Sequence, residues 1–284
     1  GTLDISGGSF TSDSNAKIGR NSGSGTLLVS GGTVDFGKGS GDGTDFSGIG
    51  EGGFGFAEFS GGTTNFDWVS LGNDHASGGA GTATAIISGG TVNTTVSDFY
   101  IGHGTNNIGG SSATLEISSG ALNTAMHLRL ADENNTGAAT TGRLIMSGGT
   151  VDVTNFNVAQ AVNAASNTAT FDMSGGTFIN DGTMNFASRG AGTLNQTGGT
   201  IRSLNFTNFG NNTGGDGTLN VTGAGASFES PNQRIGLGVA GGTGTINISA
   251  GNISSASLAL ANGSASGGLG EVNQTGGTVS VNSL

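Results

Sequence analysis

A short segment that recurs from one end of the chain to the other limits what this sequence can fold into. One copy is GTLLVSGGTVDF, over residues 25–36, and variants of it bring the number of copies to eleven. Ten repeats separate the turn at Gly7 from the turn at Gly276, so the mean period is about 27 residues. A fixed period in the twenties is typical of a solenoid, in which each repeat is one coil that packs against its neighbours.

Apolar residues at every second position indicate that each copy begins with a β-strand that has one buried face. They stand two and four residues before the first residue of each turn. In the clearest copies these pairs are Leu3 and Ile5, Leu27 and Val29, Ala57 and Phe59, Ala85 and Ile87, Leu115 and Ile117, Leu144 and Met146, Phe171 and Met173, Leu219 and Val221, and Ile246 and Ile248. The residue between the two members points outward and is polar in most copies, whereas Leu28, Ile86 and Ile145 break that rule.

Two further strands complete each coil. The second strand starts after the glycine turn, and its first inward position is almost always apolar, as in Phe10, Val34 and Val92. The third strand ends in an apolar residue followed by a small one, as in Ile18-Gly19 and Leu130-Ala131. We therefore predict an all-β, right-handed parallel β-helix with three strands per coil, about 11 coils of about 27 residues, as one continuous domain over residues 1–284.

The composition supports an ordered repeat rather than a disordered linker. Glycine occupies 59 positions, but the glycines mark the corners between regularly spaced apolar residues, a pattern that disordered segments lack. Only 33% of the residues are hydrophobic, so each coil can bury its inner face only against its neighbours. There is no cysteine, hence neither a disulfide nor thiolate chemistry is available.

The charge of the chain argues against two classes of partner. Eight Lys and Arg oppose 19 Asp and Glu, which gives a formal net charge of −11, and the basic residues do not cluster. A nucleic-acid backbone would be repelled by such a chain. The sequence also lacks a run of about 18 apolar residues, so we expect no membrane insertion.

Several outward positions in consecutive coils are asparagine, which predicts a ladder. Stacked side-chain amides can hydrogen-bond to one another along the axis of such a rod. The residues concerned are Asn195, Asn220, Asn247 and Asn273.

One outer region combines aromatic and charged residues. Counting back from the ends of the third strands in coils three to five places Trp68, Asp98 and His127 in one outward column, and Ser70, Tyr100 and Arg129 in the next. We predict that Trp68, Asp98, Tyr100, His127 and Arg129 form a surface contact patch whose exposed aromatics stack on sugars or anchor a neighbour, with a cation–π pair between Tyr100 and Arg129. The simpler alternative is an ordinary solvated surface.

The sequence predicts no catalytic residue, cofactor or metal site. The Gly50-x-Gly52-x-x-Gly55 motif lacks the helix that nucleotide binding needs, and chance matches are expected at this glycine content. His75, His103 and His127 have no zinc-ligand spacing, and solvated histidines are expected. The pairs in Asp42-Gly43-Thr44-Asp45, Asn73-Asp74 and Asp132-Glu133 could hold Ca²⁺ weakly, but charged loops are the favoured interpretation.

The recurring segment L-x-[IV]-S-G-G-T-V, as in residues 27–34, resembles the β-strand repeats of bacterial autotransporter passenger domains and related large secreted repeat proteins. The likeness extends over essentially the whole chain. It implies a parallel β-helix displayed outside a bacterial cell as an adhesin, surface layer or fibre. The sequence departs from the family pattern because no translocator barrel follows Leu284 and no cap precedes Gly1.

These observations favour a non-enzymatic structural role. We expect an extracellular or cell-surface fibre subunit or adhesin stalk, which polymerises head to tail because both ends of the sequence enter or leave a coil without a cap. The alternative for the ends is that the sequence is an excerpt of a longer array. Surface glycans or matrix components are further expected partners. The alternative function is a carbohydrate-active β-helix, of lyase or glycosidase type, or a carbohydrate-binding one.

Overall fold

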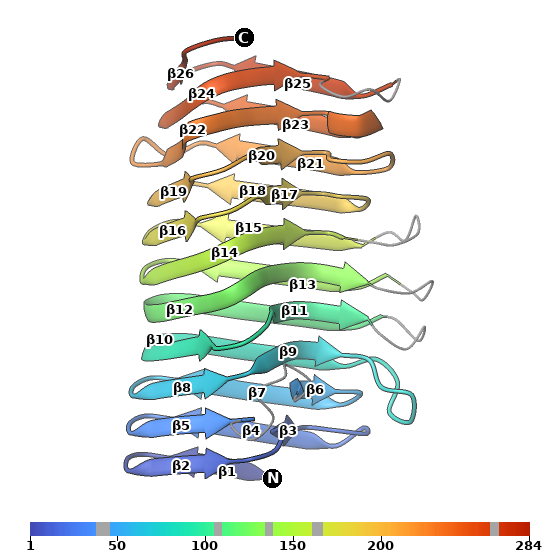
Figure 1. The fold of residues 1–284 in the computed structure, drawn as a ribbon, viewed down its shortest axis with the longest axis vertical. Coiled ribbons are helices and arrows are strands. Elements are labelled where there is room, and N and C mark those ends of the chain that lie inside the picture. Colours follow the sequence, from blue (N-terminus) through green and yellow to red (C-terminus); the bar gives the residue numbers. More distant parts are fainter. Residues whose placement is uncertain (38–45, 105–109, 134–138, 161–166, 262–266) are drawn as a thin grey trace.

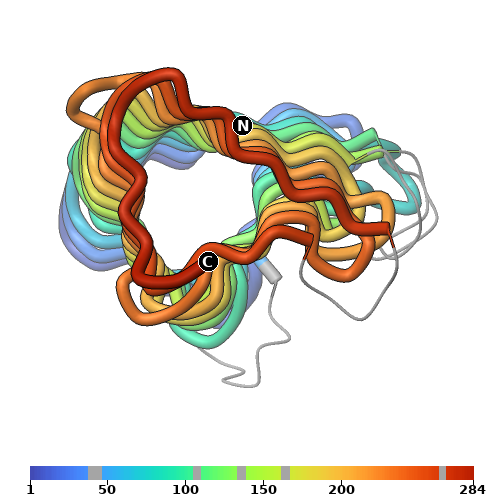
Figure 2. The backbone as a smooth tube through the Cα atoms, turned by 90° about the horizontal axis from the view of Figure 1, so that it is seen from above, coloured from blue at the N-terminus to red at the C-terminus, as the bar shows by residue number. Residues whose placement is uncertain are grey.

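The computed structural model describes residues 1–37, 46–104, 110–133, 139–160, 167–261 and 267–284. Parallel strands stack one above another into a rod, and all 26 of them belong to one sheet that winds around the axis (Figure 1). Seen from the C-terminal end, the chain runs anticlockwise as it rises toward the viewer, so the solenoid is right-handed (Figure 2). The predicted fold class is thereby confirmed.

Face one holds the strand that opens each repeat copy. It consists of β1 (Thr2–Ile5), β4 (Ser24–Val29), β7 (Phe54–Phe59), the start of β10 (Thr82–Thr94), the start of β12 (Ser112–Glu133), β13 (Thr141–Met146), β15 (Thr168–Met173), β18 (Ala191–Gln196), β21 (Asp216–Val221), β23 (Thr243–Ile248) and β25 (Leu269–Gln274). Each pairs in parallel with the next, and equivalent positions of the repeat are partners, such as Leu3 with Leu27.

Face two follows the glycine corner. It consists of β2 (Ser9–Ser12), β5 (Thr33–Phe36), β8 (Thr63–Phe66), the end of β10, the middle of β12, the start of β14 (Thr150–Val158), β16 (Thr177–Asn180), β19 (Thr200–Ser203), the start of β22 (Ser227–Leu237), the start of β24 (Asn252–Leu260) and β26 (Thr278–Val281). Several strands bend around a corner without a break, and β12 extends over all three faces.

Face three closes the coil. It consists of β3 (Lys17–Ile18), β6 (Phe46–Glu51), β9 (Trp68–Asn73), β11 (Phe99–Gly104), the ends of β12 and β14, β17 (Met184–Phe186), β20 (Thr207–Phe209) and the ends of β22 and β24. A single 3₁₀ turn, Val239–Gly241, follows β22 in the described part of the chain. The complete turns are slightly fewer than the eleven expected, because among the described residues the last copy supplies β25 and β26 but no third strand.

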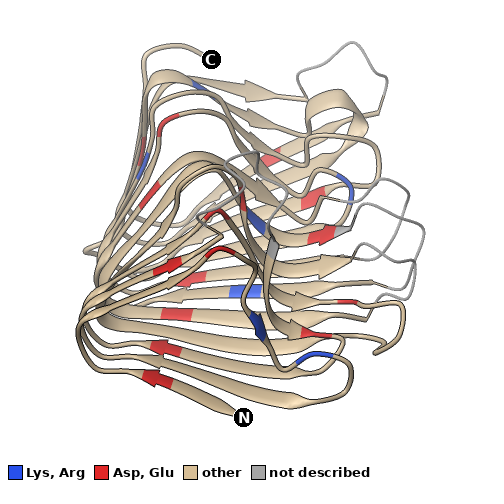
Figure 3. Ribbon diagram, turned by 60° about the horizontal axis from the view of Figure 1, so that its bottom comes forward, with Lys and Arg blue, Asp and Glu red and all other residues tan. Residues whose placement is uncertain are grey.

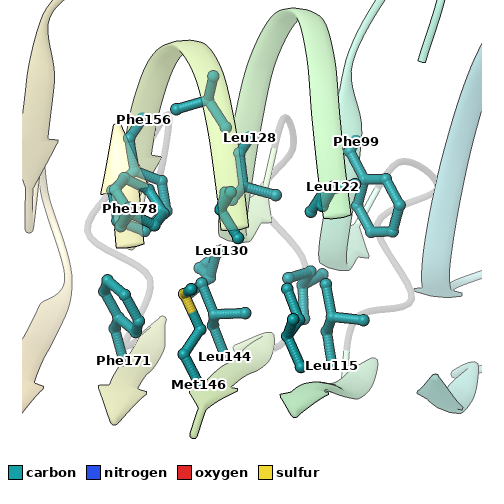
Figure 4. Packing of buried hydrophobic residues seen from close by; sticks show 14 of the residues in the cluster. Phe99, Leu115, Leu122, Leu128, Leu130, Leu144, Met146, Phe156, Phe171 and Phe178 are labelled. Atoms are coloured by element: carbon teal, nitrogen blue, oxygen red, sulfur yellow. The ribbon is translucent and has the colours of Figure 1, made fainter. Parts of the chain in front are cut away.

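The core is a continuous column of aliphatic and phenylalanine side chains along the axis. Phe156, Phe171 and Phe178 pack with ring centroids 4.8 to 5.8 Å apart, and Leu144 and Met146 continue the column in the preceding coil (Figure 4). All five side chains are completely buried. Burial of each such side chain stabilises the fold by roughly 1.5–3 kcal/mol, but only while a coil lies above and below it.

The small residue that ends the third strand is required by the backbone. Gly50 has a φ of 75°, and a Cβ there would collide with the carbonyl oxygen of Thr82 in the next coil. The equivalent residues of other coils also have positive φ, including Ala131 at 51°. The Cβ of alanine costs roughly 1–2 kcal/mol in this left-handed conformation, which explains why glycine occupies this position in most coils.

Asparagine ladders run along the rod on all three faces. On face one, the Nδ2 atoms of Asn195, Asn220, Asn247 and Asn273 each donate to the side-chain oxygen of the preceding coil, at 2.8 to 3.1 Å, and the first acceptor is Asp172. This ladder confirms the prediction. Two ladders were not predicted. One on face two joins Asp35, Asn65, Asn93 and Asn123, and one on face three joins Asn157, Asn185 and Asn208.

Candidate functional site

The five residues of the predicted patch lie together on the outer side of face three. The register pairs Tyr100 with Ser70 and with Arg129, which confirms the second predicted column. Asp98 lies between coils three and five, because its carbonyl oxygen accepts a hydrogen bond from the Val69 amide at 3.3 Å and its Oδ1 accepts one from the His127 amide at 3.1 Å. Strands β9, β11 and β12 therefore position the site.

Asp98 is the centre of this arrangement, which we call the Asp98 network. Its Oδ1 lies 2.8 Å from Nδ1 of His127, and its Oδ2 accepts from Tyr100 Oη at 3.0 Å and from Arg129 Nε at 2.8 Å. Burial alone would raise the pKa of the Asp98 carboxyl. The His127 hydrogen bond and the Arg129 charge outweigh burial, so the pKa lies below its ordinary value.

Arg129 extends the network into the following coils. Its Nη1 donates to Oδ2 of Asp132 at 2.9 Å and to Oε1 of Gln160 at 3.0 Å. The guanidinium carbon also lies 5.5 Å from the centroid of the Tyr100 ring, so the predicted cation–π pair is confirmed. Burial raises the pKa of the Asp132 carboxyl despite the opposing charge of Arg129.

An aromatic stack of Trp68, Tyr100 and His103 adjoins Asp98. The rings of Tyr100 and His103 are nearly parallel, with centroids 3.9 Å apart, and the Trp68 ring lies 5.8 Å from Tyr100. The expectation that His103 is solvated is wrong, because the side chain is 1% exposed. Burial lowers the pKa of His103 to about 3, although Asp74 nearby opposes the change. Burial likewise raises the pKa of the Tyr100 hydroxyl.

The patch is less accessible than the sequence suggested. Asp98 and Tyr100 are only 5% and 7% exposed, so the expectation of an exposed tyrosine is wrong. The physical reason is that Trp68, His103 and Arg129 cover the Tyr100 ring from neighbouring positions. Trp68, His127 and Arg129 are half-buried and form the outer surface of the site.

Sequence reasoning missed three members of the network, His103, Asp132 and Gln160. A signal for them was present. The residue that follows the small left-handed position is polar in five successive coils, and the column consists of Glu51, Asn73, His103, Asp132 and Gln160. Four of these residues are buried, which indicates that the column lies inside the structure rather than on its surface.

A second charged group, which we call the Glu51 cluster, joins the first coils on the same side of the rod. The Glu51 carboxylate lies 2.9 Å from Lys17 Nζ and 3.5 Å from Arg20 Nε. His75 adds its Nε2 at 3.8 Å from Glu51 and 2.9 Å from the Arg20 guanidinium. Burial lowers the pKa of Lys17, and the contact with Glu51 only partly offsets this effect. Sequence reasoning did not anticipate the cluster.

The other motifs considered in the sequence, for nucleotide, calcium or metal binding, do not form a binding site among the described residues. Strand β7, rather than a helix, follows the Gly50-x-Gly52-x-x-Gly55 motif. Asp74 is completely buried, the Asp42 to Asp45 pair lies outside the described residues, and so does the side chain of Glu133. Within the described residues, no three His, Asp or Glu side chains are grouped closely enough to hold a metal ion. None of the described helical segments is long and apolar enough to span a membrane.

The Asp98 network can hold charge firmly in place, and its outer rim presents Trp68, His127 and Arg129.

Comparisons of the chain with protein-family models, with curated proteins and with solved structures give no match.

Proposed function

We propose that the chain is a rigid structural element of an extracellular fibre, filament or adhesin stalk. The observation that carries this proposal is the set of hydrogen-bonded ladders parallel to the long axis. Backbone pairing continues from β1 to β25 on face one, and Asn ladders add one side-chain hydrogen bond per coil along parts of all three faces.

The direction of these bonds suits a spacer. Every coil is bonded to the next along the same axis, so bending or stretching the rod must strain many bonds together. Eleven strands on face one, at about 4.8 Å each, correspond to a length of roughly 50 Å. Neighbouring coils contribute most of the stability of a solenoid, hence a longer stack is more stable than a short one.

The outermost coils support extension of the rod by further stacking. Strands β25 and β26 pair on one side only among the described residues, and Leu269 at the start of β25 and Leu260 at the end of β24 are 66% and 50% exposed. Exposed strand edges beside apolar side chains act as templates for pairing. The edges would be continued by additional coils in a longer array, or by a second molecule in head-to-tail assembly, and a contact that does not close on itself gives a filament.

Sedimentation and electron microscopy of the purified chain test the assembly. We expect end-to-end rods whose number grows with protein concentration, and loss of this association in Leu269→Glu. Met126→Glu is the matched control, because Met126 is 44% exposed but belongs to the bend of β12 within the rod, and it should assemble like wild type. Single rods at every concentration, or equal behaviour of both variants, would exclude head-to-tail assembly.

A carbohydrate-active or carbohydrate-binding β-helix is a second candidate, favoured by the Asp98 network alone. It brings two carboxylates, an arginine, a tyrosine and a histidine together in one hydrogen-bonded group, and carbohydrate-cleaving sites commonly use paired carboxylates. A screen of acidic and neutral polysaccharides, with Asp98→Asn as the comparison, tests it. Cleavage that disappears in the variant, while the fold is kept, would favour this candidate over the structural role.

A further inference from the structure

Strand β7 has two phenylalanines on its outer side, where the neighbouring coils carry small hydroxyl residues. Phe54 is 62% exposed, and Phe56 is half-buried. The register pairs Phe54 with Ser24 and Thr82, and it pairs Phe56 with Thr26 and Thr84. The inward residues of the same strand are Gly55, Ala57 and Phe59. Packing of the core therefore does not require either outward ring, because coils with Ser and Thr at these positions stack in the same way.

The two rings belong to an outward-facing surface on face one, which we call the β7 platform and define as Leu28, Phe54, Phe56, Glu58 and Ile86. Glu58 follows Phe56 at the next outward position of β7 and is paired with Leu28 and Ile86 in the adjacent coils. Outward residues along a strand are about 6.8 Å apart, and equivalent residues of adjacent coils are about 4.8 Å apart. The platform is thus an apolar strip beside a carboxylate, bordered by columns of Ser and Thr hydroxyls.

The charge of face one limits which kinds of polymer the β7 platform can bind. The outward positions of β1, β4, β7 and the starts of β10 and β12 include Asp4, Glu58 and Glu116 but neither Lys nor Arg. Asp and Glu recur along the rod, whereas Lys and Arg are few (Figure 3). Lys17 and Arg20 lie at the corner before β7, where both contact Glu51, so the acidic character belongs to the outward positions of face one, which would attract a positively charged polymer.

We propose that the β7 platform binds a linear polysaccharide of amino sugars whose amines are protonated. Each part of such a sugar matches a group on the platform. The C–H face of the ring packs on Phe54 and Phe56, and the ring hydroxyls exchange hydrogen bonds with the flanking Ser and Thr columns. The ammonium group pairs with the Glu58 carboxylate and lies against aromatic faces, which attract cations. A lysine-rich peptide would match the carboxylates but not the hydroxyl columns.

The amino-sugar polymer would be a partner of the proposed extracellular rod. Its binding rests on that proposed function only in that the rod must present face one to solvent. The platform lies on the side of the rod, so binding can be measured whether or not molecules stack end to end. Failure of binding would leave the assembly result unchanged, and failure of assembly would leave binding unchanged.

The test is titration calorimetry of the whole chain with a glucosamine hexamer, at a pH at which its amines are protonated. The double variant F54S/F56T restores the residue types of the adjacent coils, so we expect it to fold and to bind roughly tenfold more weakly. E58Q should weaken binding roughly threefold at low salt and reduce its salt dependence. Phe206→Ser is the matched control, since Phe206 is 40% exposed on another face, and it should bind like wild type.

Three results would overturn the proposal. The first is absence of binding at millimolar hexamer, and the second is equal affinity of wild type and F54S/F56T, with circular dichroism confirming that both are folded. The third is tighter binding of an oligolysine peptide or of the fully N-acetylated hexamer. If light scattering shows a side-by-side dimer that F54S/F56T dissolves, a second copy of the chain is the occupant instead and the proposal fails.

Discussion

The two halves of face one fill the same outward column with different kinds of residue. From β1 to β13, acidic and aliphatic residues alternate, in the order Asp4, Leu28, Glu58, Ile86, Glu116 and Ile145. From β15 to β25, the column continues as Asp172 followed by four asparagines that are hydrogen-bonded to one another. The backbone register is the same throughout, so the difference lies in the side chains.

The contrast follows from hydrogen-bonding capacity. An amide has both a donor and an acceptor, so it can stack on itself at every coil, whereas a carboxylate only accepts. Like charges at adjacent positions of a sheet are destabilising. Placing an aliphatic residue between two acids separates them by about 9.6 Å, close to the Debye length at physiological ionic strength. The aliphatic residues that broke the polar rule of the sequence are therefore the spacers of this arrangement.

Asp172 joins the two arrangements. Its Oδ2 accepts two hydrogen bonds from Arg143, at 2.7 and 2.9 Å, and its Oδ1 accepts from Asn195 at 2.8 Å. Because the ladder amides all donate toward the N-terminal end, a carboxylate is a suitable first acceptor. The N-terminal half also contains the Asp98 network and the Glu51 cluster, so it depends on paired charges more than the C-terminal half does.

Removal of the half-buried Arg129 from the N-terminal half should have the largest effect. Arg129→Met leaves the carboxylates of Asp98 and Asp132 without their arginine, and we expect a loss of about 3 kcal/mol in the free energy of unfolding. Urea denaturation measures it. Arg202→Met, at an exposed position of the C-terminal half, should cost less than about 1 kcal/mol. Equal losses in the two variants would contradict the comparison.

Acid should destabilise the N-terminal half through His103. The pKa of His103 is lowered from 6.5 to about 3 in the folded chain, so between these values the unfolded chain binds a proton that the folded chain does not. Stability should therefore fall with decreasing pH across this window, by about 1.4 kcal/mol per pH unit for this one group. Denaturation curves between pH 6.5 and 4.5 measure the slope.

His103→Gln provides the comparison, since its slope should be flatter by about one proton. Two carboxyls act near the lower end of the window with opposite signs. The lowered pKa of Asp98 contributes stability that is lost as the pH falls through it, whereas the raised pKa of Asp132 favours the folded state as the pH falls. An unchanged slope in His103→Gln would show that His103 does not determine the acid sensitivity.

A broken ladder should have a smaller effect. Asn220→Leu removes two hydrogen bonds of half-exposed amides and should cost about 1 kcal/mol. Asn220→Asp should cost more, about 2 kcal/mol, because its carboxylate would face the Asn195 side-chain oxygen without a proton to donate. Thermal unfolding ranks the two variants. If the aspartate variant is as stable as wild type, the side-chain amide donors of the ladder do not contribute to the stability of the rod.

The columns of the rod could be predicted from the sequence because register in a repeat is set by the period alone. Leu27 in one coil must meet Leu3 in the previous one, and the same count predicted the face-one Asn ladder and the pairing of Tyr100 with Arg129. Small residues at the end of the third strand were also visible in the sequence, and they adopt the left-handed conformation in the structure.

What lies over an outer face could not be predicted, because that depends on side-chain directions. Tyr100 was expected to be exposed, but its ring folds against His103 from the same strand and under Arg129 from the next coil. The Glu51 cluster was missed for a similar reason, since His75 reaches Glu51 from a return loop whose length differs from coil to coil. The two Asn ladders on the other faces differ from these cases, because their residues recur with the period of the repeat.

The smallest expected effect comes from removing one spacer on face one. Ile86→Asp places a third carboxylate between Glu58 and Glu116, about 4.8 Å from each, and should cost about 1 kcal/mol at low salt. Ile86→Asn introduces a side chain of the same size as aspartate but without its charge. Its amide can donate to the Glu58 carboxylate, just as the Asn195 amide donates to Asp172. We therefore expect the asparagine variant to be more stable than the aspartate variant, with a gap that shrinks as salt is raised from 0.01 M to about 1 M and the Debye length falls to about 3 Å. Urea denaturation at the two salt concentrations measures the gap. If it is independent of salt, repulsion between stacked carboxylates does not explain the alternation of acidic and aliphatic residues, and the packing of Ile86 itself must do so.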